Sequence, residues 1–362
     1  MKILAIESSC DETSAAVVEK NGDGIVVLSN ITATSLEIHA KTGGIIPENA
    51  ARMQVRYILP VIIEALCTSE NRKQKSKDKS WDRARTILKQ DIDAIAVTYG
   101  PGLIGSLLVG VETVKTLAYV FEKPIIPINH FLAHIYANFI QTINYKLQTI
   151  NFPFVGLIVS GGHTDLLLFN KHGKYEWLGG TRDDAAGEAF DKVGRILGLP
   201  YPAGPEIERR ANLVVQTNIK FKSPIISEDN FDFSFSGLKT EASRYIEKSG
   251  VTSGGGPQTP LLNEVCYATQ KAIIDVLVKK TLKAAEKYNC STILVGGGVS
   301  ANQTLIDQLK LNAKHSNLNP EIFSPEKIYC TDNGAMIGAY ALLNYSEANW
   351  SEIKANPELY FA

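Results

Sequence analysis

The sequence predicts an α/β protein made of two similar lobes. Strand-like apolar runs alternate with helix-like segments along most of the chain, as in α/β folds. Residues 2–19 and 154–169 also share one pattern, namely a buried-strand run, a turn of small polar residues and a returning strand. The length of 362 residues suits two domains, because about 150 residues per domain is typical.

In the first half, residues 2–7 predict a buried strand, residues 8–13 a small polar turn, and residues 14–19 a second strand. A further strand at 93–98 runs into Tyr99-Gly100-Pro101-Gly102. A helix through about residue 120 follows this turn. This half therefore predicts two turns of small residues, each at the end of a strand.

The second half repeats the arrangement. Residues 154–159 and 165–169 predict a strand pair around the turn at 160–164. A strand at 291–295 then enters Gly296-Gly297-Gly298, with a helix from about residue 300. Two such lobes facing each other across a cleft would bring all four turns into that cleft.

Charge and cysteine content limit the function classes. Lys and Arg number 37 and Asp and Glu 38, so the net charge of -1 excludes a uniformly basic protein, and any nucleic-acid contact must come from local patches. Glu7 interrupts the N-terminus before a secretory apolar region forms, and no apolar run reaches about 18 residues. The five cysteines are scattered and never form a CxxC pair. We therefore expect a cytoplasmic protein without a membrane segment.

Two stretches depart from the alternating pattern. Residues 71–90 hold eight Lys or Arg against two Asp, which predicts either a solvated loop or insertion, or a contact for RNA phosphate or an acidic partner. Residues 249–260 are rich in Gly and Pro and predict a loop.

A histidine pair stands out as a metal-site candidate. His130 and His134 follow Asn129, which is a natural N-cap for a helix running to about residue 140. The i, i+4 spacing puts both imidazoles on one helix face, where they can share a metal ion. Phe131 occupies the place of the glutamate in the HExxH motif of zinc proteases, so the general base of that class is missing.

Asp332 has two interpretations from the residues alone. It precedes an expected helix at 335–343, so it predicts either a helix N-cap or a third metal ligand.

Residues 181–199 predict a helix whose acidic side chains share one face. Asp184, Glu188 and Asp191 lie at i, i+4 and i+7, so their carboxylates repel one another unless a positive or hydrogen-bonding group faces them. The stripe predicts either a solvated acidic face or a site that accepts hydrogen bonds from a ligand.

The glycine-rich turns are weak signals one by one. A Gly-rich turn before a helix offers bare backbone to an anion or a nucleoside, but a tight turn without a ligand explains each one equally well. None carries the sequence of a P-loop or a GxGxxG fingerprint. Four turns of small residues at equivalent places of a repeat, three of them with glycine, favour nucleotide binding.

Eight motifs in order resemble one family, from the first residues to nearly the last. The chain resembles the TsaD family of tRNA N6-adenosine threonylcarbamoyltransferases, in its bacterial and organellar form. The motifs are Ile6-Glu7-Ser8-Ser9-Cys10-Asp11-Glu12-Thr13, Tyr99-Gly100-Pro101-Gly102-Leu103, Asn129-His130-Phe131-Leu132-Ala133-His134, Val159-Ser160-Gly161-Gly162-His163-Thr164, Asp183-Asp184-Ala185-Ala186-Gly187-Glu188-Ala189-Phe190-Asp191-Lys192, Phe235-Ser236-Gly237-Leu238-Lys239, Gly296-Gly297-Gly298-Val299-Ser300-Ala301-Asn302 and Thr331-Asp332-Asn333-Gly334-Ala335-Met336.

The resemblance implies an actin/Hsp70/sugar-kinase-like (ASKHA) fold with two ribonuclease-H-like lobes around a central cleft. We expect residues 1–128, joined by the C-terminal helix at about 333–362, to form the N-terminal lobe. Residues 129–332 form the second lobe, with the metal and nucleotide site at the cleft. The resemblance also implies one divalent metal ion, iron or zinc, held by His130, His134 and Asp332.

The implied reaction transfers a threonylcarbamoyl group from L-threonylcarbamoyl-adenylate to N6 of adenosine 37 in tRNAs that read codons beginning with A, with release of AMP. As catalytic residues we expect Asp11 and Glu12, one of which would take the proton from the amine. The implied partners are tRNA, a TsaB-like paralogue and a small TsaE-like ATPase. The implied substrate-binding residues are Val159, Ser160, Gly161, Gly162, His163, Asp191, Gly204 and Asn302.

Two departures from the family pattern are visible. Ala203 replaces a glycine of the usual Pro-Gly-Gly-Pro, so its methyl group either narrows a ligand's approach or is absorbed. Gln54 stands where the family often has histidine, so a histidine role is not carried over. Two other classes stay open, namely an ATP phosphotransferase or ATPase of the same fold superfamily and a zinc peptidase.

Overall fold

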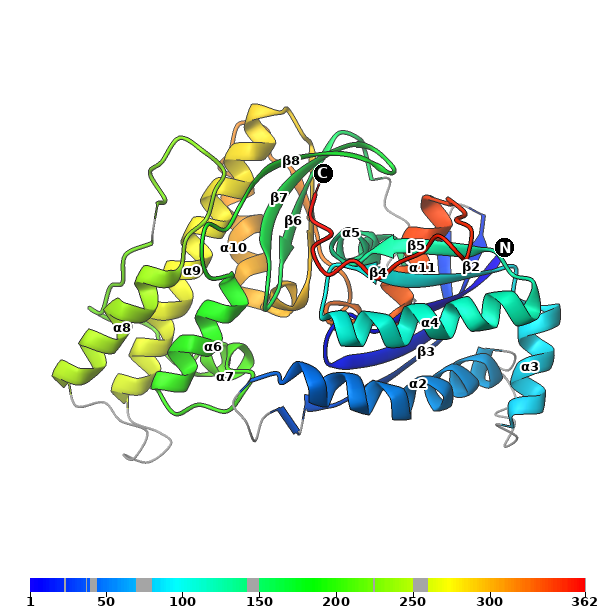
Figure 1. Cartoon of the computed structure of the whole chain (residues 1–362). Coiled ribbons are helices and arrows are strands. Elements are labelled where there is room, and N and C mark those ends of the chain that lie inside the picture. Colours follow the sequence, from blue (N-terminus) through cyan, green and yellow to red (C-terminus); the bar gives the residue numbers. More distant parts are fainter. Residues whose placement is uncertain are drawn as a thin grey trace. The chain divides into compact units, whose positions relative to one another are not determined.

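A computed structural model describes residues 1–22, 24–36, 38–39, 44–69, 80–141, 150–223, 225–249 and 260–361 (Figure 1). The chain divides into two compact units. Unit 1 consists of Met1–Thr149 with Lys327–Ala362, and unit 2 consists of Ile150–Glu326.

Unit 1 is built on a five-stranded sheet in the order β3-β2-β1-β4-β5. β2 pairs antiparallel with both β1 and β3, whereas β1, β4 and β5 run parallel. The strands are β1 (Lys2–Glu7), β2 (Glu12–Asn21), β3 (Gly24–Thr34), β4 (Ala94–Gly100) and β5 (Ile125–Asn129), and the helices are α2 (Pro47–Ser69), α3 (Trp81–Gln90), α4 (Ile104–Phe121), α5 (His130–Tyr136), the 3₁₀ turns η1 (Ala137–Phe139) and η3 (Lys327–Tyr329), and α11 (Gly334–Leu343).

Unit 2 has a sheet in the order β10-β9-β6-β7-β8. β7 pairs antiparallel with both β6 and β8, and β6, β9 and β10 run parallel. The strands are β6 (Phe154–Val159), β7 (Thr164–Lys171), β8 (Lys174–Gly180), β9 (Thr292–Gly296) and β10 (Glu321–Phe323), and the helices are α6 (Ala186–Ile196), α7 (Gly204–Ala211), α8 (Ser236–Ser249), α9 (Pro260–Lys287), the 3₁₀ turn η2 (Gly298–Ala301) and α10 (Gln303–Ala313).

The two sheets have the same topology. In each, the first strand is central, the next two strands form an antiparallel meander on one side, and the last two add in parallel on the other. The internal repeat predicted from the sequence is therefore confirmed as a duplicated α/β sheet, in keeping with the ASKHA fold class.

The boundaries of the units differ from those expected from the sequence. The division falls after residue 149 and before residue 327, rather than after 128 and 332. The reason is packing, because α5 contacts α11, β4 and β5 of unit 1, so the histidine helix belongs with the N-terminal sheet. The placement of the two units, and with it the expected cleft, stays a prediction.

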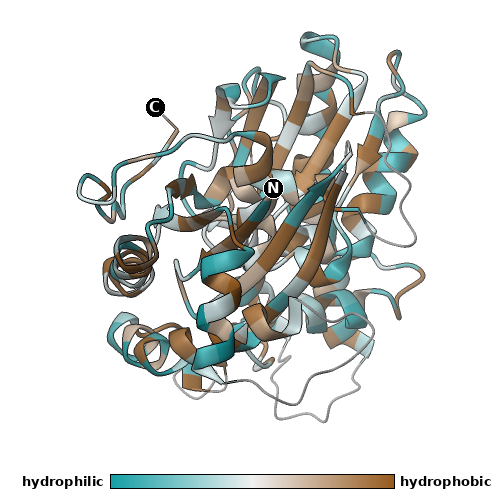
Figure 2. Cartoon of the chain, turned by 90° about the vertical axis from the view of Figure 1, so that its right-hand side faces the viewer, coloured by the Kyte–Doolittle hydropathy of each residue, from teal (hydrophilic) through white to brown (hydrophobic). Residues whose placement is uncertain are grey.

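Both faces of the unit 1 sheet are covered. Alternate residues of β1 point to opposite faces, so Leu4 and Ile6 join the apolar cluster with α2 and α4, while Ala5 contacts Gly338 of α11. Figure 2 shows the resulting brown, hydrophobic stretches along the strands, with teal segments on the helices.

α4 is the one helix, among the residues the structure describes, that is long and apolar enough to cross a membrane. The expectation that no apolar run reaches about 18 residues was wrong. Residues 104–121 are 18 residues long and apolar on average, although Glu112 and Lys115 lie among them. One face of α4, including Leu107, Val111 and Val114, is buried in unit 1, where α4 contacts β4 and α2. These contacts explain its apolar character as that of a core-forming helix.

The basic stretch is partly helical rather than a loop. Residues 70–79 lie outside the described part, but Trp81–Gln90 form α3, capped by the Ser80 hydroxyl and packed through Ala84, Ile87 and Leu88. Most of the Gly- and Pro-rich stretch at 249–260 also lies outside the described residues.

Candidate functional site

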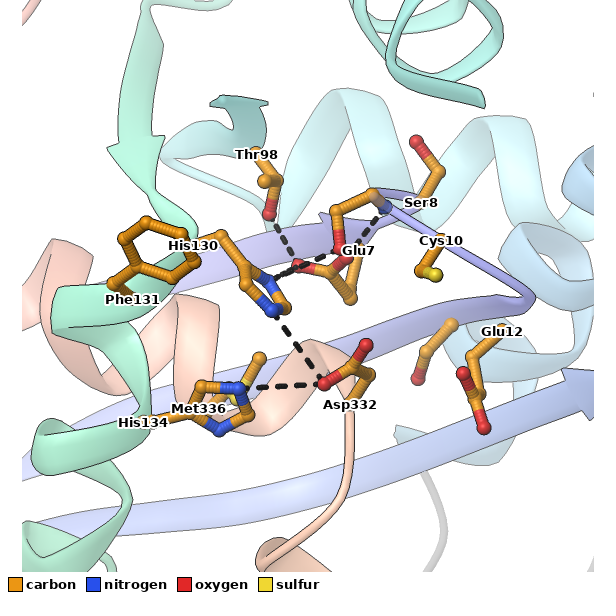
Figure 3. Close-up of polar contacts among 12 residues, drawn as sticks. Glu7, Ser8, Cys10, Glu12, Thr98, His130, Phe131, His134, Asp332 and Met336 are labelled. Carbon is orange, nitrogen blue, oxygen red and sulfur yellow. Dashed lines mark hydrogen bonds and ion pairs between the residues drawn. The ribbon is translucent and has the colours of Figure 1, made fainter. Parts of the chain in front are cut away.

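The histidine pair begins α5 as the sequence predicted. The side-chain oxygen of Asn129 accepts hydrogen bonds from the N–H groups of Phe131 (2.9 Å) and Leu132 (3.3 Å), which caps the helix. The α-helix ends at Tyr136 rather than residue 140, because the chain continues as η1. His130 and His134 are both buried, on one face of this short helix (Figure 3).

Asp332 is not the cap of the next helix. That role belongs to Asn333, whose side-chain oxygen accepts from the N–H of Met336 at 3.0 Å, so the cap interpretation was wrong by one residue. The Asp332 carboxylate instead points toward the histidines (Figure 3), with its Oδ1 at 3.5 Å from Nε2 of His130 and 3.3 Å from Nε2 of His134.

These three side chains fit a divalent cation. Their ligand atoms all lie within 4.8 Å of one another. His134 is almost fully buried, yet neither of its ring nitrogens makes a hydrogen bond with a described residue. Apart from the contact of its Nε2 with Asp332, this imidazole has lost its water contacts, whereas a bound ion would use its lone pair. Two imidazoles and one carboxylate suit zinc or ferrous iron.

Glu7 is a member of this site that the sequence analysis missed. Its Oε2 lies 3.1 Å from Nδ1 of His130 and accepts from the Thr98 hydroxyl at 2.5 Å, while its Oε1 accepts from the Ser9 N–H at 2.6 Å. A carboxylate behind a ligating histidine fixes the tautomer and turns the other nitrogen toward the metal. The available signal was an acid at the end of an otherwise apolar buried strand.

The carboxylates control the protonation of the site. Burial alone would lower the pKa of His130, but the charges of Glu7 and Asp332 outweigh it and raise the pKa to about 9. Burial, with the negative charges of Asp332 and Asp11, raises the pKa of Glu12 to about 10. Acidic groups therefore act on both residues, and a cation at the histidines would offset their charge.

Of the predicted catalytic residues, Asp11 lies in the turn between β1 and β2, and Glu12 is the first residue of β2. The turn at 99–102 packs against the β1–β2 turn, because the N–H of Leu103 donates to the Ser9 carbonyl at 2.8 Å. A Cβ on Gly102 would lie 2.5 Å from that carbonyl oxygen, which accounts for the glycine. Unit 1 thus joins two of the four predicted turns.

The turn of Ser160, Gly161, Gly162 and His163 follows β6 in unit 2. The N–H of Ser160 donates to the His163 carbonyl (2.8 Å), and the N–H of His163 to the Ser160 hydroxyl (3.2 Å), so both are used within the turn. Gly161 and Gly162 are exposed, and their N–H groups donate to no acceptor in the described chain. Within this turn, these two amides are the candidates to donate to a ligand.

The other glycine turn of unit 2 lies beside this one. Gly297 has a φ of +94°, and a Cβ there would lie 2.5 Å from the carbonyl oxygen of Val159. Both the left-handed backbone and the close approach require glycine. Unit 2 therefore also joins its two turns.

Asp191, Gly204 and Asn302 have contacts of their own. Asp191 accepts from the N–H of Ala203 at 2.7 Å, beside Gly204. Asn302 caps α10 through its side-chain oxygen, which accepts from Leu305, and its amide donates to Gln270 at 3.0 Å. Asp191 and Asn302 thus already use some of their hydrogen-bond donors and acceptors in contacts within unit 2.

The helix at 181–199 is shorter than predicted, because Thr181 pairs with Phe233 and α6 begins at Ala186. Lys192 offsets the repulsion between the acidic side chains of the stripe, because its ammonium contacts Asp184 at 2.5 Å and Glu188 at 2.8 Å. The two carboxylates therefore form a surface ion-pair group.

The methyl group of Ala203 is accommodated within unit 2 and does not narrow a ligand's approach. Ala203 is 2% exposed and packs against Gly194.

Comparisons with known proteins agree with these motifs. Residues 26–339 match the family described as tRNA N6-adenosine threonylcarbamoyltransferase, TsaD. Relatives with that name include those of Moorella thermoacetica (43% identity, 98% of this chain and 95% of the relative) and Latilactobacillus sakei (41% identity, 98% and 94%). The relative from Clostridium kluyveri is 42% identical over 98% of this chain and 96% of its own length.

Solved structures support the fold alone. Full-length HypF in a phosphate- and nucleotide-bound form matches with a TM-score of 0.56, and T. kodakarensis HypF with 0.57, each at 13% identity. They cover 95% and 94% of this chain, which spans about half the length of each HypF chain (47%). With its family match and its relatives, the chain belongs to the tRNA N6-adenosine threonylcarbamoyltransferase family and is a tRNA-modifying enzyme that forms threonylcarbamoyladenosine.

Proposed function

We propose that the donor substrate is L-threonylcarbamoyl-adenylate and the acceptor is adenosine 37 of tRNAs that read codons beginning with A. The adenosine N6 amine attacks the carbamoyl carbon, the bond from that carbon to the phosphate oxygen breaks, and AMP leaves. The observation that carries the proposal is the convergence of His130, His134 and Asp332 beside the acidic turn at residues 8–12.

We propose that these three side chains hold one iron or zinc ion. When bound, the ion supplies positive charge that offsets charge growing on the ligand oxygens. Glu7 keeps His130 oriented for ligation through the contact at its Nδ1.

In unit 2, the amides of Gly161 and Gly162 would donate to an oxyanion of the substrate, because they lack acceptors in the described chain. Asp191 and Asn302 would help to orient the adenylate through the hydrogen-bonding positions that their contacts within unit 2 do not use. Val159, Ser160, His163 and Gly204 would shape the binding surface.

The acidic turn would manage the proton that the amine loses. The neighbouring carboxyl groups of Asp11 and Glu12 act as a pair, since Asp11 contributes to the raised pKa of Glu12. The pair would accept the proton as N6 forms its new bond, and positive charge at the histidines would lower the pKa of Glu12.

The test of the metal role is His130→Ala, followed by mass analysis of tRNA nucleosides. The reaction contains threonine, bicarbonate, ATP, a carbamoyl-adenylate synthase and the expected partner proteins. We expect bound metal and threonylcarbamoyladenosine both to be lost while the protein stays folded. His315→Ala, at an exposed histidine of unit 2, serves as the control and should keep full activity. Activity retained by His130→Ala would contradict the metal role.

We also propose a surface for the TsaB-like paralogue on α2 and α4. Val55, Leu59, Ile104 and Leu108 are 44–65% exposed, and α2 packs directly on α4. Adjacent exposed apolar residues on two helices are typical of a protein interface. Leu108→Glu should abolish co-elution with the paralogue on size-exclusion chromatography, and Leu311→Glu, at an exposed leucine of unit 2, should not. Co-elution unaffected by Leu108→Glu would exclude this surface.

We propose a small TsaE-like ATPase as the further partner and a cytoplasmic location for the reaction. Omitting the ATPase from the nucleoside assay should stop repeated turnover. Undiminished turnover without it would remove this partner from the proposal.

A further inference from the structure

One buried amide from α2 makes three contacts with the backbone of residues 8–12, the segment that carries Asp11 and Glu12. Gln54 is 1% exposed, and its Nε2 donates to the carbonyl oxygens of Ser8 (3.3 Å), Cys10 (2.9 Å) and Glu12 (3.2 Å). Three carbonyls spaced by two residues therefore converge on one NH₂ group. An amide has two N–H donors, so at least one of them is shared.

The surroundings of the turn explain why this contact matters. α4 also contributes, because the Ser106 hydroxyl donates to the Cys10 carbonyl at 3.1 Å. Gln54 in addition donates to a carbonyl on each side of Cys10, at Ser8 and at Glu12. Removing it would leave Ser106, which accepts from the Ser8 hydroxyl and donates to the Cys10 carbonyl, as the contact to the helix layer, and Ser35 as a donor to the Asp11 carbonyl. The Glu12 carbonyl would lose its contact with α2.

We propose that Gln54 is a positioning residue that fixes the backbone of residues 8–12 and thereby the aim of the Asp11 and Glu12 carboxyl groups. This rests on the proposed role of those two residues. The sequence already marks the position, because Gln54 stands where the family often has histidine. A neutral imidazole offers one N–H, whereas the amide offers two to the same three carbonyls.

Stability and positioning are separable at this site. The side-chain oxygen of Gln54 is buried and has no hydrogen-bond partner among the described residues. An unpaired buried acceptor is unfavourable, so an apolar side chain of similar size would remove that penalty while also removing the donors. The carbonyl of Cys10 keeps its hydrogen bond from the Ser106 hydroxyl. A leucine at residue 54 should therefore offset part of the stability lost with the donors to the Ser8 and Glu12 carbonyls, and it should release the turn.

The experiment compares Gln54→Leu with the unchanged chain by alkylation of cysteines, read residue by residue with mass spectrometry. Cys10 is half-buried and lies in the turn, whereas Cys67, Cys266, Cys290 and Cys330 are buried and report on global unfolding. We expect alkylation of Cys10 to accelerate by about tenfold, with the other four unchanged. The rate of threonylcarbamoyladenosine formation should fall by about tenfold or more, and bound metal should be unchanged.

Two further variants keep the test decisive. Gln54→Met removes the donors at similar volume and should behave like leucine, while Gln54→His retains a donor and should restore slow alkylation of Cys10. Arg52→Leu, on the same helix but exposed and paired only with Glu48 in the described structure, should change nothing.

Alkylation of Cys10 that stays at the original rate in both Gln54→Leu and Gln54→Met would overturn the proposal. If Gln54→Leu fails to fold, the comparison of Gln54→Met with Gln54→His decides. Because alkylation does not depend on turnover, it separates this proposal from the proposed reaction. Inactivity of the unchanged chain would count against the reaction alone.

Discussion

At the scale of single residues, Glu7 shows how much of this site depends on groups behind the ligands. Its carboxylate is fully buried and contacts His130, Thr98 and Ser9. Burial would raise the pKa of Glu7, but the neighbouring His130 outweighs this and lowers it. The charged carboxylate therefore favours the His130 tautomer whose Nε2 is available to a metal.

We expect Glu7→Gln to weaken metal binding by about 10- to 100-fold, because an amide can donate to Nδ1 and stabilise the wrong tautomer. Competition with a chelator of known affinity measures the change. Thr98→Val removes only the hydrogen bond to Glu7 and should weaken binding less. Equal affinities for Glu7→Gln and the unchanged chain would argue against the orienting role.

The raised pKa of Asp165 predicts that the stability of the protein depends on pH. Burial raises the pKa of Asp165 from 3.8 to about 6, although the indole N–H of Trp177 donates to it at 3.0 Å. Because the folded-state pKa lies above the ordinary value, the ionised form opposes folding. This penalty is absent below the ordinary pKa, grows as the pH rises toward 6, and is complete above it.

Asp165→Asn keeps an acceptor for Trp177 and cannot ionise. It should therefore raise the free energy of unfolding at pH 7.5 by about 1–3 kcal/mol, with the difference vanishing near pH 4. Urea denaturation at the two pH values measures this. Asp183→Asn is the control of opposite sign, because four hydrogen bonds from residues 234–236 outweigh burial and lower the pKa of Asp183. A variant of Asp165 that gains nothing at pH 7.5 would refute the argument.

At the scale of elements, the contact of α6 with the start of α7 explains the Pro202-Ala203-Gly204-Pro205 departure. A Cβ built on Gly194 of α6 would lie 2.1 Å from the Cβ of Ala203. The methyl group that Ala203 adds therefore occupies space that Gly194 leaves open. The packing of α6 against the start of α7 therefore explains why alanine is accommodated at residue 203.

We expect Gly194→Ala to destabilise the protein by about 1–3 kcal/mol through this clash. The double variant Gly194→Ala, Ala203→Gly should recover most of the loss, because it moves the methyl group from one helix to the other. Thermal denaturation of both single variants and the double variant measures the coupling. Additive effects would mean that the two positions do not compete for space.

The same scale shows why some element limits were predicted and others were not. Residues 2–7 and 154–159 form strands as predicted, because a continuous apolar run needs a buried sheet position wherever it lies in the chain. The start of α6 was misplaced because Thr181 pairs with Phe233, more than fifty residues away. Residues 81–90 were misjudged because only three buried side chains hold α3 to the unit.

At the scale of the whole molecule, near-neutral charge limits how this chain holds tRNA. With 37 basic and 38 acidic residues, it lacks the uniform positive field of many RNA-binding proteins. The part of the basic stretch that the structure describes lies on α3, where Arg85 and Lys89 are exposed. Contact with tRNA must then depend on such local patches or on a partner.

We expect the isolated chain to bind tRNA weakly, with an affinity that falls steeply as salt increases. Fluorescence anisotropy with labelled tRNA at several salt concentrations measures both properties. Adding the paralogue should tighten binding. Tight binding by the chain alone that is insensitive to salt would contradict the prediction.

The sequence by itself determined the duplicated α/β class, the four turns of small residues and the His130 and His134 pair, because periodicity and i, i+4 spacing are local properties. Only the tertiary structure decided that Asn333 rather than Asp332 caps α11, that Glu7 stands behind His130, and that Gln54 anchors the acidic turn. Each of these depends on which distant segments fold together, as Asp332 reaches His134 across 198 residues of chain. Local pattern carries no information about such contacts, whose energy comes from burial and from the pairing of polar groups.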